Sequence, residues 1–268
     1  MDHRPQAWGR PRDDVYGAYD HSYLQSGGPK QMTQSPVVTG TSVIGIKFKD
    51  GVILAADNLA SYGSLARFTD VKRLRVFLGT SVVGFGGDVS DMQYLDRHLN
   101  ELAIDESYEG GGAQEEHGEK GKLNAANLHT YLHKLMYRRR NDFDPLWNQV
   151  LVAGLDAAGK PHLSSVDLRG TAFTSPSLAT GFGAALAQPI MRKYAATEED
   201  AARLTRDQAV KVVQECMKVL YYRDARSLDK YSIAVVTKDG VELKEDEQLE
   251  KQSWAFAEQI RGYGTQTV

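Results

Sequence analysis

Thr41 is the residue of this chain with the clearest potential for chemistry. It follows Gly40 and begins the run TSVIGIKFKDGVILAAD, which ends sixteen residues later at Asp57. A threonine hydroxyl becomes a nucleophile when a nearby base takes its proton, and acyl transfer also needs N–H donors for the oxyanion. The simpler role for a β-branched residue is a structural place in a strand. The elements around Thr41 decide between these two roles.

Those elements alternate between strand pairs and helix pairs. Apolar runs separated by turn residues predict strands at 43–48 and 52–56, 72–77 and 81–85, 149–155 and 162–167, and 232–236 and 241–243. Apolar residues at helical spacing predict helices near 92–102, 128–140, 178–194 (bent at Pro189) and after the capping box of Thr205 and Gln208. Hairpins alternating with helix pairs predict an α+β fold of two antiparallel sheets covered by helix layers.

Polar segments precede and interrupt the single predicted domain. Residues 1–32 are rich in Gly, Pro, Asp, Gln and Tyr and predict a flexible leader. Their tyrosines could form a docking motif, although isolated tyrosines in a mobile segment are the simpler interpretation. Residues 107–122 are polar and glycine-rich and predict an exposed insertion. The domain is expected to span 33–261, followed by a tail at 262–268.

Composition excludes several classes of function. A formal net charge of -3 gives no sign of a nucleic-acid or anionic-membrane partner, and no apolar run is long enough to span a bilayer. The single cysteine, Cys216, lies in an apolar helical stripe and predicts a buried, inert thiol in a reducing compartment. No metal or other cofactor is predicted. His129 and His133 lack nearby carboxylate or cysteine ligands and are better explained by a solvent-facing helix surface.

The chain from Thr41 through Asp91 resembles, without a gap, the start of a mature proteasome β-subunit. The resemblance implies an N-terminal-nucleophile hydrolase fold, a four-layer α/β/β/α sandwich. In active members a threonine released after glycine is the nucleophile, and its own α-amine is the base. The resemblance implies that Thr41 corresponds to the nucleophile, Asp57 to the supporting aspartate and Gly87 to the oxyanion donor. It also implies that Asp224 and Ser227, in the run Tyr-Arg-Asp-Ala-Arg-Ser, lie near the threonine.

Two positions depart from the active pattern. The essential lysine of active subunits falls on Arg73, and a guanidinium cannot accept a proton as a lysine amine can. The family's Gly-Ser-Gly is replaced by Gly181-Phe182-Gly183, and a phenyl ring cannot relay a proton. The resemblance therefore implies a vestigial site with no catalytic residue.

Further motifs resemble the non-catalytic subunit at the seventh β position of the ring. They are Thr33-Gln-Ser-Pro, Ser61-Tyr-Gly-Ser, Pro145-Leu-Trp-Asn, Pro176-Ser-Leu-Ala and Val219-Leu-Tyr-Tyr. That resemblance implies a leader cut between Met32 and Thr33, which leaves Thr41 bonded to Gly40. It also implies a C-terminal tail (Gly262, Tyr263, Gly264, Thr265) that reaches the opposite β-ring, while Trp254 and Phe256 pack on their own domain.

The expected function is that of a non-catalytic structural β-subunit of the 20S core particle, which supports ring assembly and ubiquitin-dependent protein degradation. Its partners would be other α- and β-subunits, with assembly factors possible, and its location cytoplasmic and nuclear, as the family implies. The alternative is an active threonine endopeptidase subunit that uses Thr41. A phosphate-binding module at Gly84–Gly87 has suitable local geometry but lacks a P-loop lysine or serine.

Overall fold

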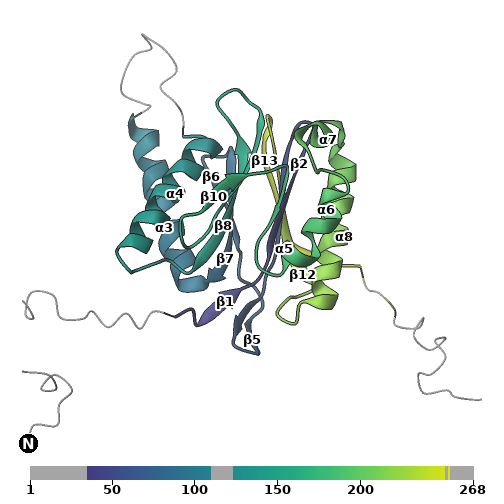
Figure 1. Cartoon of the computed structure of the whole chain (residues 1–268), viewed down its shortest axis with the longest axis horizontal. Coiled ribbons are helices and arrows are strands. Elements are labelled where there is room, and N and C mark those ends of the chain that lie inside the picture. The colour runs from purple at the N-terminus through teal and green to yellow at the C-terminus, as the bar shows by residue number, and fades with distance from the viewer. Residues whose placement is uncertain (1–34, 110–122, 251–252, 254–268) are drawn as a thin grey trace, which may run out of the picture. The chain divides into compact units, whose positions relative to one another are not determined.

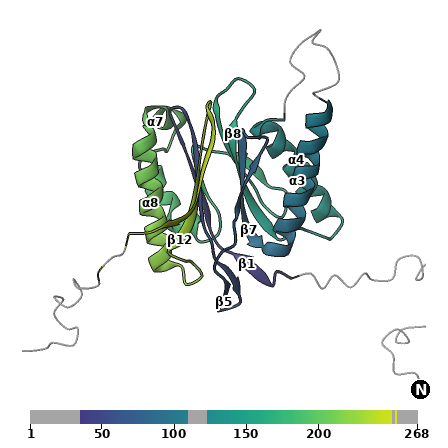
Figure 2. The same ribbon diagram turned by 180° about the vertical axis from the view of Figure 1, so that it is seen from behind.

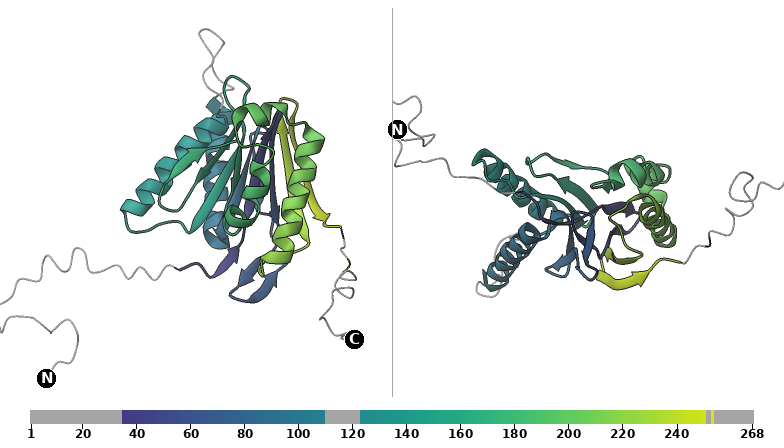
Figure 3. Two further views of the ribbon diagram at one scale, coloured as in Figure 1. Left: turned by 45° about the vertical axis from the view of Figure 1, so that its right-hand side comes forward. Right: turned by 90° about the horizontal axis from the view of Figure 1, so that it is seen from below.

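Two antiparallel sheets face each other, and helices cover the outer face of each sheet (Figure 1; Figure 2). The computed structural model describes residues 35–109, 123–250 and 253. Figure 3 shows from below the two helix layers on opposite sides of the paired sheets. The four-layer α/β/β/α arrangement that the sequence predicts is confirmed.

Sheet A has eight strands. Its order is β10 (Ala172–Thr174), β9 (Pro161–Val166), β8 (Asn148–Leu155), β7 (Ser81–Asp88), β1 (Val38–Gly40), β4 (Ala60–Tyr62) and β5 (Leu65–Phe68), with β6 (Leu74–Phe77) also paired to β7. Its outer face is covered by α3 (Val89–Glu109) and α4 (Ala125–Asn141).

Sheet B has five strands, in the order β11 (Ser177–Ala179), β2 (Val43–Phe48), β3 (Gly51–Asp57), β12 (Lys230–Thr237) and β13 (Gly240–Gln248). The helices on its outer face are α5 (Gly183–Leu186), α6 (Gln188–Arg192), α7 (Glu198–Arg203) and α8 (Arg206–Arg223). Both faces of β2 and β3 are covered, and every residue of these two strands is buried. This explains why they read as continuous apolar runs and not as alternating ones.

The apolar core has three layers. One lies between the sheets and includes Val43, Leu54 and Leu151. The other two lie between each sheet and its helices, with Leu95 and Leu132 on the α3–α4 side and Cys216 on the α8 side. The predicted burial of Cys216 is confirmed, and this burial raises the pKa of its thiol to about 12.

Several predicted elements are confirmed, and one predicted helix is wrong. The predicted hairpins and the capping box at Thr205 are present. The single helix predicted over 178–194 is wrong, because residues 177–179 pair with β2 as a strand and Gly181 turns the chain at φ 59°. Pro189 lies in the first turn of a separate helix, where it is tolerated. Residues 107–109 of the predicted insertion belong to α3, and 110–122 lie outside the described residues.

Candidate functional site

Thr41 lies where the chain crosses from sheet A to sheet B, between β1 and β2. It is half-buried, and its hydroxyl donates a hydrogen bond of 2.6 Å to Asp224 Oδ2. Asp224 is 5% exposed and ends α8, and its second oxygen accepts the backbone N–H of Arg226 at 2.9 Å. The Thr41 hydroxyl is therefore held by a carboxylate from an element far away in the sequence.

Arg73 is the most unusual residue beside Thr41, because its large charged side chain is 1% exposed. Its guanidinium donates to four backbone oxygens, those of Asp57 (2.9 Å), Thr41 (2.8 Å), Phe85 (3.1 Å) and Ser42 (2.9 Å). It also forms an ion pair with the Asp57 carboxylate. Arg73 and Asp57 are therefore joined as a structural ion pair. Through these hydrogen bonds the arginine holds several backbone segments in place. Its guanidinium has no lone pair with which to accept a proton.

Asp57 is 2% exposed and lies at the end of β3. Burial raises the pKa of its carboxyl, although the Arg73 charge and the Leu59 N–H both act to lower it. Arg73 and Asp57 thus form a buried ion pair in which each charge is stabilised by the other. Removing either residue would leave the other charge buried without a counter-charge. Gly40 completes this packing, since a Cβ there would lie 2.5 Å from Arg73 Cδ.

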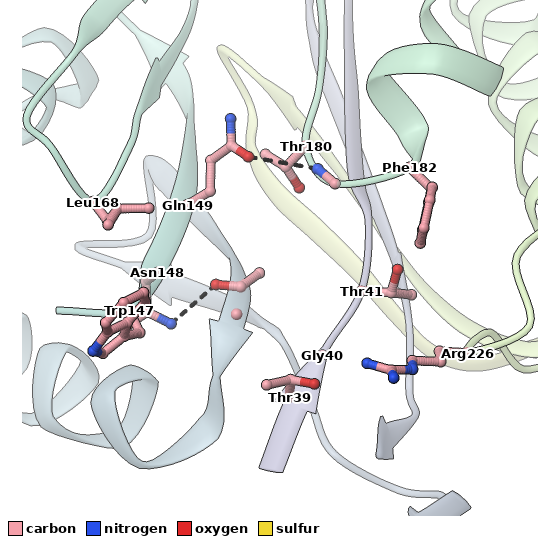
Figure 4. A pocket seen from close by; sticks show the side chains of 13 residues that line it. Thr39, Gly40, Thr41, Trp147, Asn148, Gln149, Leu168, Thr180, Phe182 and Arg226 are labelled. Carbon is pink, nitrogen blue, oxygen red and sulfur yellow. Dashed lines mark hydrogen bonds between the residues drawn. The ribbon is translucent and has the colours of Figure 1, made fainter. Parts of the chain in front are cut away.

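Phe182 lies at the start of α5, where the family resemblance implies a serine. Its side chain is 61% exposed. The loop that carries it is anchored by the Gly183 N–H, which donates to Ser42 Oγ at 2.9 Å. In Figure 4 the Phe182 ring and the Thr41 side chain extend into the same space, with Gln149 and Leu168 on its other side. A phenyl ring offers no hydrogen-bonding group to Thr41 there.

The segment just before Thr41 occupies a place in sheet A. Strand β1 lies between β4 and β7, with Val38 opposite Tyr62 and Gly40 opposite Gly87. The Val37 N–H donates to Asp88 Oδ1 at 3.0 Å, which holds the start of this strand. Gly87, the predicted oxyanion donor, adopts φ 92° and already faces Gly40 of the same chain. The peptide upstream of Thr41 therefore fills the position beside β7 that an added extended peptide would otherwise take.

A cavity of about 440 Å³ opens beside Thr41 (Figure 4). Its lining residues come from β1, β7, β8 and the segments after β1, α4, β9, β11 and α8. They are Thr39, Gly40, Thr41, Gly86, Gly87, Trp147, Asn148, Gln149, Leu168, Thr180, Gly181, Phe182 and Arg226. Thr41, Gly87 and Phe182 of the predicted set thus meet in one space, and Asp57, Arg73 and Asp224 lie behind it through the contacts described above.

Ser227, another residue of the predicted set, is hydrogen-bonded within the turn after α8 and not to Thr41. Its hydroxyl has one proton to donate and lies within hydrogen-bonding distance of two carbonyl oxygens, that of Asp224 at 2.8 Å and that of Leu220 at 3.1 Å. These bonds fix the turn after α8 and so position Asp224. Sequence reasoning missed Asn148, whose amide donates to the Gly86 and Asp88 oxygens at 2.9 Å each. No sequence signal marks such a residue, because its partners are backbone atoms.

The interpretation of His129 and His133 as a solvent-facing pair is wrong. Both are half-buried, and His133 Nδ1 lies 2.8 Å from the Gly170 oxygen. The His129 ring lies against that of His162 on β9, at 5.7 Å between centroids. Burial lowers the pKa of both His129 and His162, the latter to about 4.

Two other kinds of feature are absent from the described residues, namely a metal-binding cluster and a membrane-spanning helix. Across residues 35–109, 123–250 and 253, no three or more His, Cys, Asp or Glu side chains gather closely enough to hold a metal ion. No helix within those ranges has both the length and the apolar character needed to cross a bilayer.

Comparisons with known proteins agree with this geometry. The family model described as "Proteasome subunit" matches residues 37–236. A probable proteasome subunit beta type-7 of Schizosaccharomyces pombe is 46% identical over 266 residues, covering 98% of this chain and 97% of that protein. Proteasome subunit beta type-7 of Saccharomyces cerevisiae is 44% identical over 270 residues and the full length of both. Proteasome subunit beta type-4 of Xenopus laevis is 43% identical over 236 residues, or 88% of this chain and 92% of that one.

The family match covers most of the chain, and the relatives align over nearly their entire lengths. The two-sheet sandwich and the clustering of Thr41, Asp57, Arg73 and Asp224 at one end of it are consistent with those matches. The chain therefore belongs to the proteasome subunit family, and within it to the β-subunits.

Proposed function

We propose that this chain is a non-catalytic, structural β-subunit of the 20S proteasome core particle, at the position whose relatives carry the names beta type-7 and beta type-4. It would assemble with other α- and β-subunits, form part of the wall of the proteolytic chamber and serve ubiquitin-dependent degradation in cytoplasm and nucleus. The observation that carries the proposal is the burial of Arg73 against four backbone oxygens and Asp57.

Arg73 stands where the resemblance implies a catalytic lysine. A proton-handling group must exchange protons as the reaction proceeds. The Arg73 guanidinium instead holds the backbone of Thr41 and Ser42 in place as a permanent donor. Phe182, in place of a serine, adds no proton relay. Thr41, Asp57, Gly87, Asp224 and Ser227 thus retain the outline of a threonine protease site without a working base.

The bond between Gly40 and Thr41 supplies an independent argument. The α-amine of Thr41 can act as a base only after this bond is cut. Gly40 pairs with Gly87 and packs on Arg73, and Val37 is held by Asp88. These contacts favour a mature chain that retains β1. We infer processing between Met32 and Thr33, so that residues 1–32 are the leader and 33–261 the domain.

The decisive experiment measures the mature N-terminus of this subunit in assembled particles, by intact mass and N-terminal sequencing. A start at Thr33 is expected. A start at Thr41 would contradict the proposal and favour the alternative, an active threonine endopeptidase subunit.

A second experiment tests catalysis directly in assembled particles. Thr41→Ala is expected to leave every peptidase activity of the particle unchanged per assembled particle, as does the control Thr39→Ala two residues upstream. Loss of one peptidase activity in the Thr41 variant alone would overturn the assignment of a silent site. Normalising to assembled particles is necessary because the substitution also removes the hydrogen bond to Asp224.

A further inference from the structure

Sheet B contains the same four residues, Lys-Asp-Gly-Val, in two of its hairpins. They are residues 49–52, at the turn from β2 to β3, and residues 238–241, at the turn from β12 to β13. These are also the two places in the sequence where glycine directly follows aspartate. An Asp-Gly bond is chemically labile, because glycine has no side chain to keep its backbone nitrogen away from the aspartate carboxyl. The two hairpins therefore place one reactive sequence in two environments.

The two turns lie side by side at one end of sheet B. Thr237 pairs with Gly51 on one side and with Gly240 on the other. Figure 1 shows the β12–β13 hairpin ending at the top of the sandwich. Asp50 and Asp239 are both exposed, and within the described residues neither carboxylate has a hydrogen-bond or ion-pair partner. A difference in reactivity between them must therefore come from the backbone around each glycine.

Gly51 is held on both sides. Strand β3 lies inside sheet B, and Gly51 pairs with β2 and with β12. A Cβ at Gly51 would lie 1.9 Å from the Val236 oxygen, so the neighbouring backbone leaves no room for movement there. The turn before it is also anchored, since the Lys49 N–H donates to the Leu204 oxygen at 3.0 Å. Movement of the Gly51 nitrogen toward the Asp50 carboxyl would disrupt these contacts.

Gly240 is held on one side. It begins β13, the edge strand of sheet B, and among the described strands it pairs with β12 alone. It is half-buried and adopts φ 119°, a region that Gly51 does not adopt. Outside its chain neighbours, the atom nearest to a Cβ at Gly240 would be the Gly79 oxygen, at 3.9 Å. The backbone around Gly240 can therefore move without displacing a second strand, as local opening at a sheet edge requires.

We propose that Asp239 is a site of spontaneous isomerisation to isoaspartate in the folded chain, and that the sheet protects Asp50. In the first step the Gly240 nitrogen attacks the side-chain carboxyl carbon of Asp239. A C–N bond forms, and the amide proton leaves with the carboxyl OH as water, which gives a succinimide. In the second step water adds to the former main-chain carbonyl of Asp239, and the bond from that carbon to the Gly240 nitrogen breaks. The water lost is regained, so composition is unchanged and no oxidant or reductant is needed.

The product carries a new chemical group in the β12–β13 turn. The backbone gains one carbon atom there, and the former main-chain carbonyl of Asp239 becomes a carboxylate on the α-carbon. An α-carboxylate of this kind is the group to which isoaspartyl methyltransferases transfer a methyl group from S-adenosylmethionine. This modification goes beyond the proposed function and does not depend on whether Thr41 is silent.

The size of the protection at Asp50 follows from the extra pairing of Gly51. Reaching the succinimide there breaks at least one more backbone hydrogen bond than at Gly240, and a loss of that size slows a reaction about tenfold. The identical flanking residues remove sequence as a cause of the difference.

The first test stores the folded full chain at neutral pH and physiological temperature for weeks. Isoaspartate is then located by peptide mapping and by labelling with an isoaspartyl methyltransferase and S-adenosylmethionine. Position 239 should accumulate isoaspartate about tenfold faster than position 50. In urea the two positions should react at similar rates. Equal rates in the folded chain, no isoaspartate at position 239, or a tenfold difference that persists in urea would each overturn the inference.

The second test compares Asp239→Glu with the matched variant Asp50→Glu. Glutamate keeps the charge but must close a larger ring, which forms more slowly. Asp239→Glu should abolish methyl labelling of the fragment that spans residues 230–250, whereas Asp50→Glu should leave this labelling unchanged. Persistent labelling in the first variant, or its loss in the second, would contradict the inference. Circular dichroism of both full chains checks that each variant is folded during storage.

Discussion

At the scale of single residues, Arg73 illustrates how a buried charge can serve structure in place of chemistry. Its donors join Asp57 of β3, Phe85 of β7, and Thr41 and Ser42 of the segment between β1 and β2. Desolvating a guanidinium and a carboxylate is costly, and only a complete set of partners offsets that cost. The site is therefore stable as a whole and intolerant of the loss of one member.

This predicts a large effect for Arg73→Met. The substitution leaves Asp57 without its counter-charge and four carbonyl oxygens without their donor, so the free energy of unfolding should fall by about 3–5 kcal/mol. Urea denaturation of the full chain measures it. The control Arg75→Met removes a side chain that is 39% exposed and 3.6 Å from Asp96, and should cost less than about 1 kcal/mol. Equal effects of the two substitutions would mean that the buried pair has no special structural role.

At the scale of elements, helix α8 carries Asp224 to Thr41, and its two ends are both fixed. At its start Thr205 accepts the Gln208 N–H while Gln208 reaches back to the Thr205 N–H, a complete capping box. At its end the Asp224 N–H bonds to the Leu220 oxygen. The length of α8 is therefore fixed, and the Asp224 carboxylate at its end accepts the hydrogen bond of the Thr41 hydroxyl.

Thr205→Ala should consequently lower the free energy of unfolding by about 1 kcal/mol, within the usual range for a lost N-cap. Thr205→Ser keeps an accepting oxygen and should change it by only a few tenths of that amount. Thermal or urea denaturation of both variants decides the matter. Identical stability of the alanine and serine variants would show that the cap contributes nothing measurable.

The contact between α4 and β9 makes stability depend on pH. The folded-state pKa of His162 is lowered to about 4, mainly by burial and secondarily by His129, while the unfolded value is near 6.5. The unfolded chain thus binds more protons between these values, so stability falls as pH decreases through this window and levels off below about pH 4. After allowance for partial solvent screening, the loss should be about 1–2 kcal/mol.

Urea denaturation between pH 7 and pH 4 tests this dependence, with His162→Gln as the matched variant. The variant should lose part of the decrease seen between pH 6.5 and pH 4. A decrease of the same size in both proteins would assign it to other groups, such as His129, whose pKa is also lowered by burial.

At the scale of the whole molecule, the proposed role is carried by surfaces and segments outside the Thr41 site. The residues Gly262, Tyr263, Gly264 and Thr265, which lie outside the described residues, are proposed to reach the opposite ring. Deleting 262–268 should leave the chain folded and slow the joining of half-particles, measured by native gel electrophoresis over time. Joining at the normal rate would remove the tail from the proposed interface.

The sequence alone determined the local structure and the family. The hairpin at 43–48 and 52–56, the helices α4 and α8 and the capping box are readable because each is specified by neighbouring residues. The presence of Arg73 and Phe182 where the family resemblance implies a lysine and a serine could also be read from the sequence. Whether a side chain can transfer a proton depends on the residue type alone. The position of Thr41 directly after Gly40, however, suggested a cut that the resemblance to one subunit and the packing of β1 both argue against.

Only the tertiary structure decided how the site is held together. Strands of three or four residues, such as β1, β4 and β5, contain too few alternations to be recognised. They form because the longer β7 leaves hydrogen bonds that β1 satisfies, and β4 and β5 then pair in turn. The partners of Arg73 are mostly backbone oxygens, which every residue carries and no sequence pattern marks. The reason is physical: side-chain type is written in the sequence, whereas the convergence of distant backbone groups exists only after the two sheets have packed.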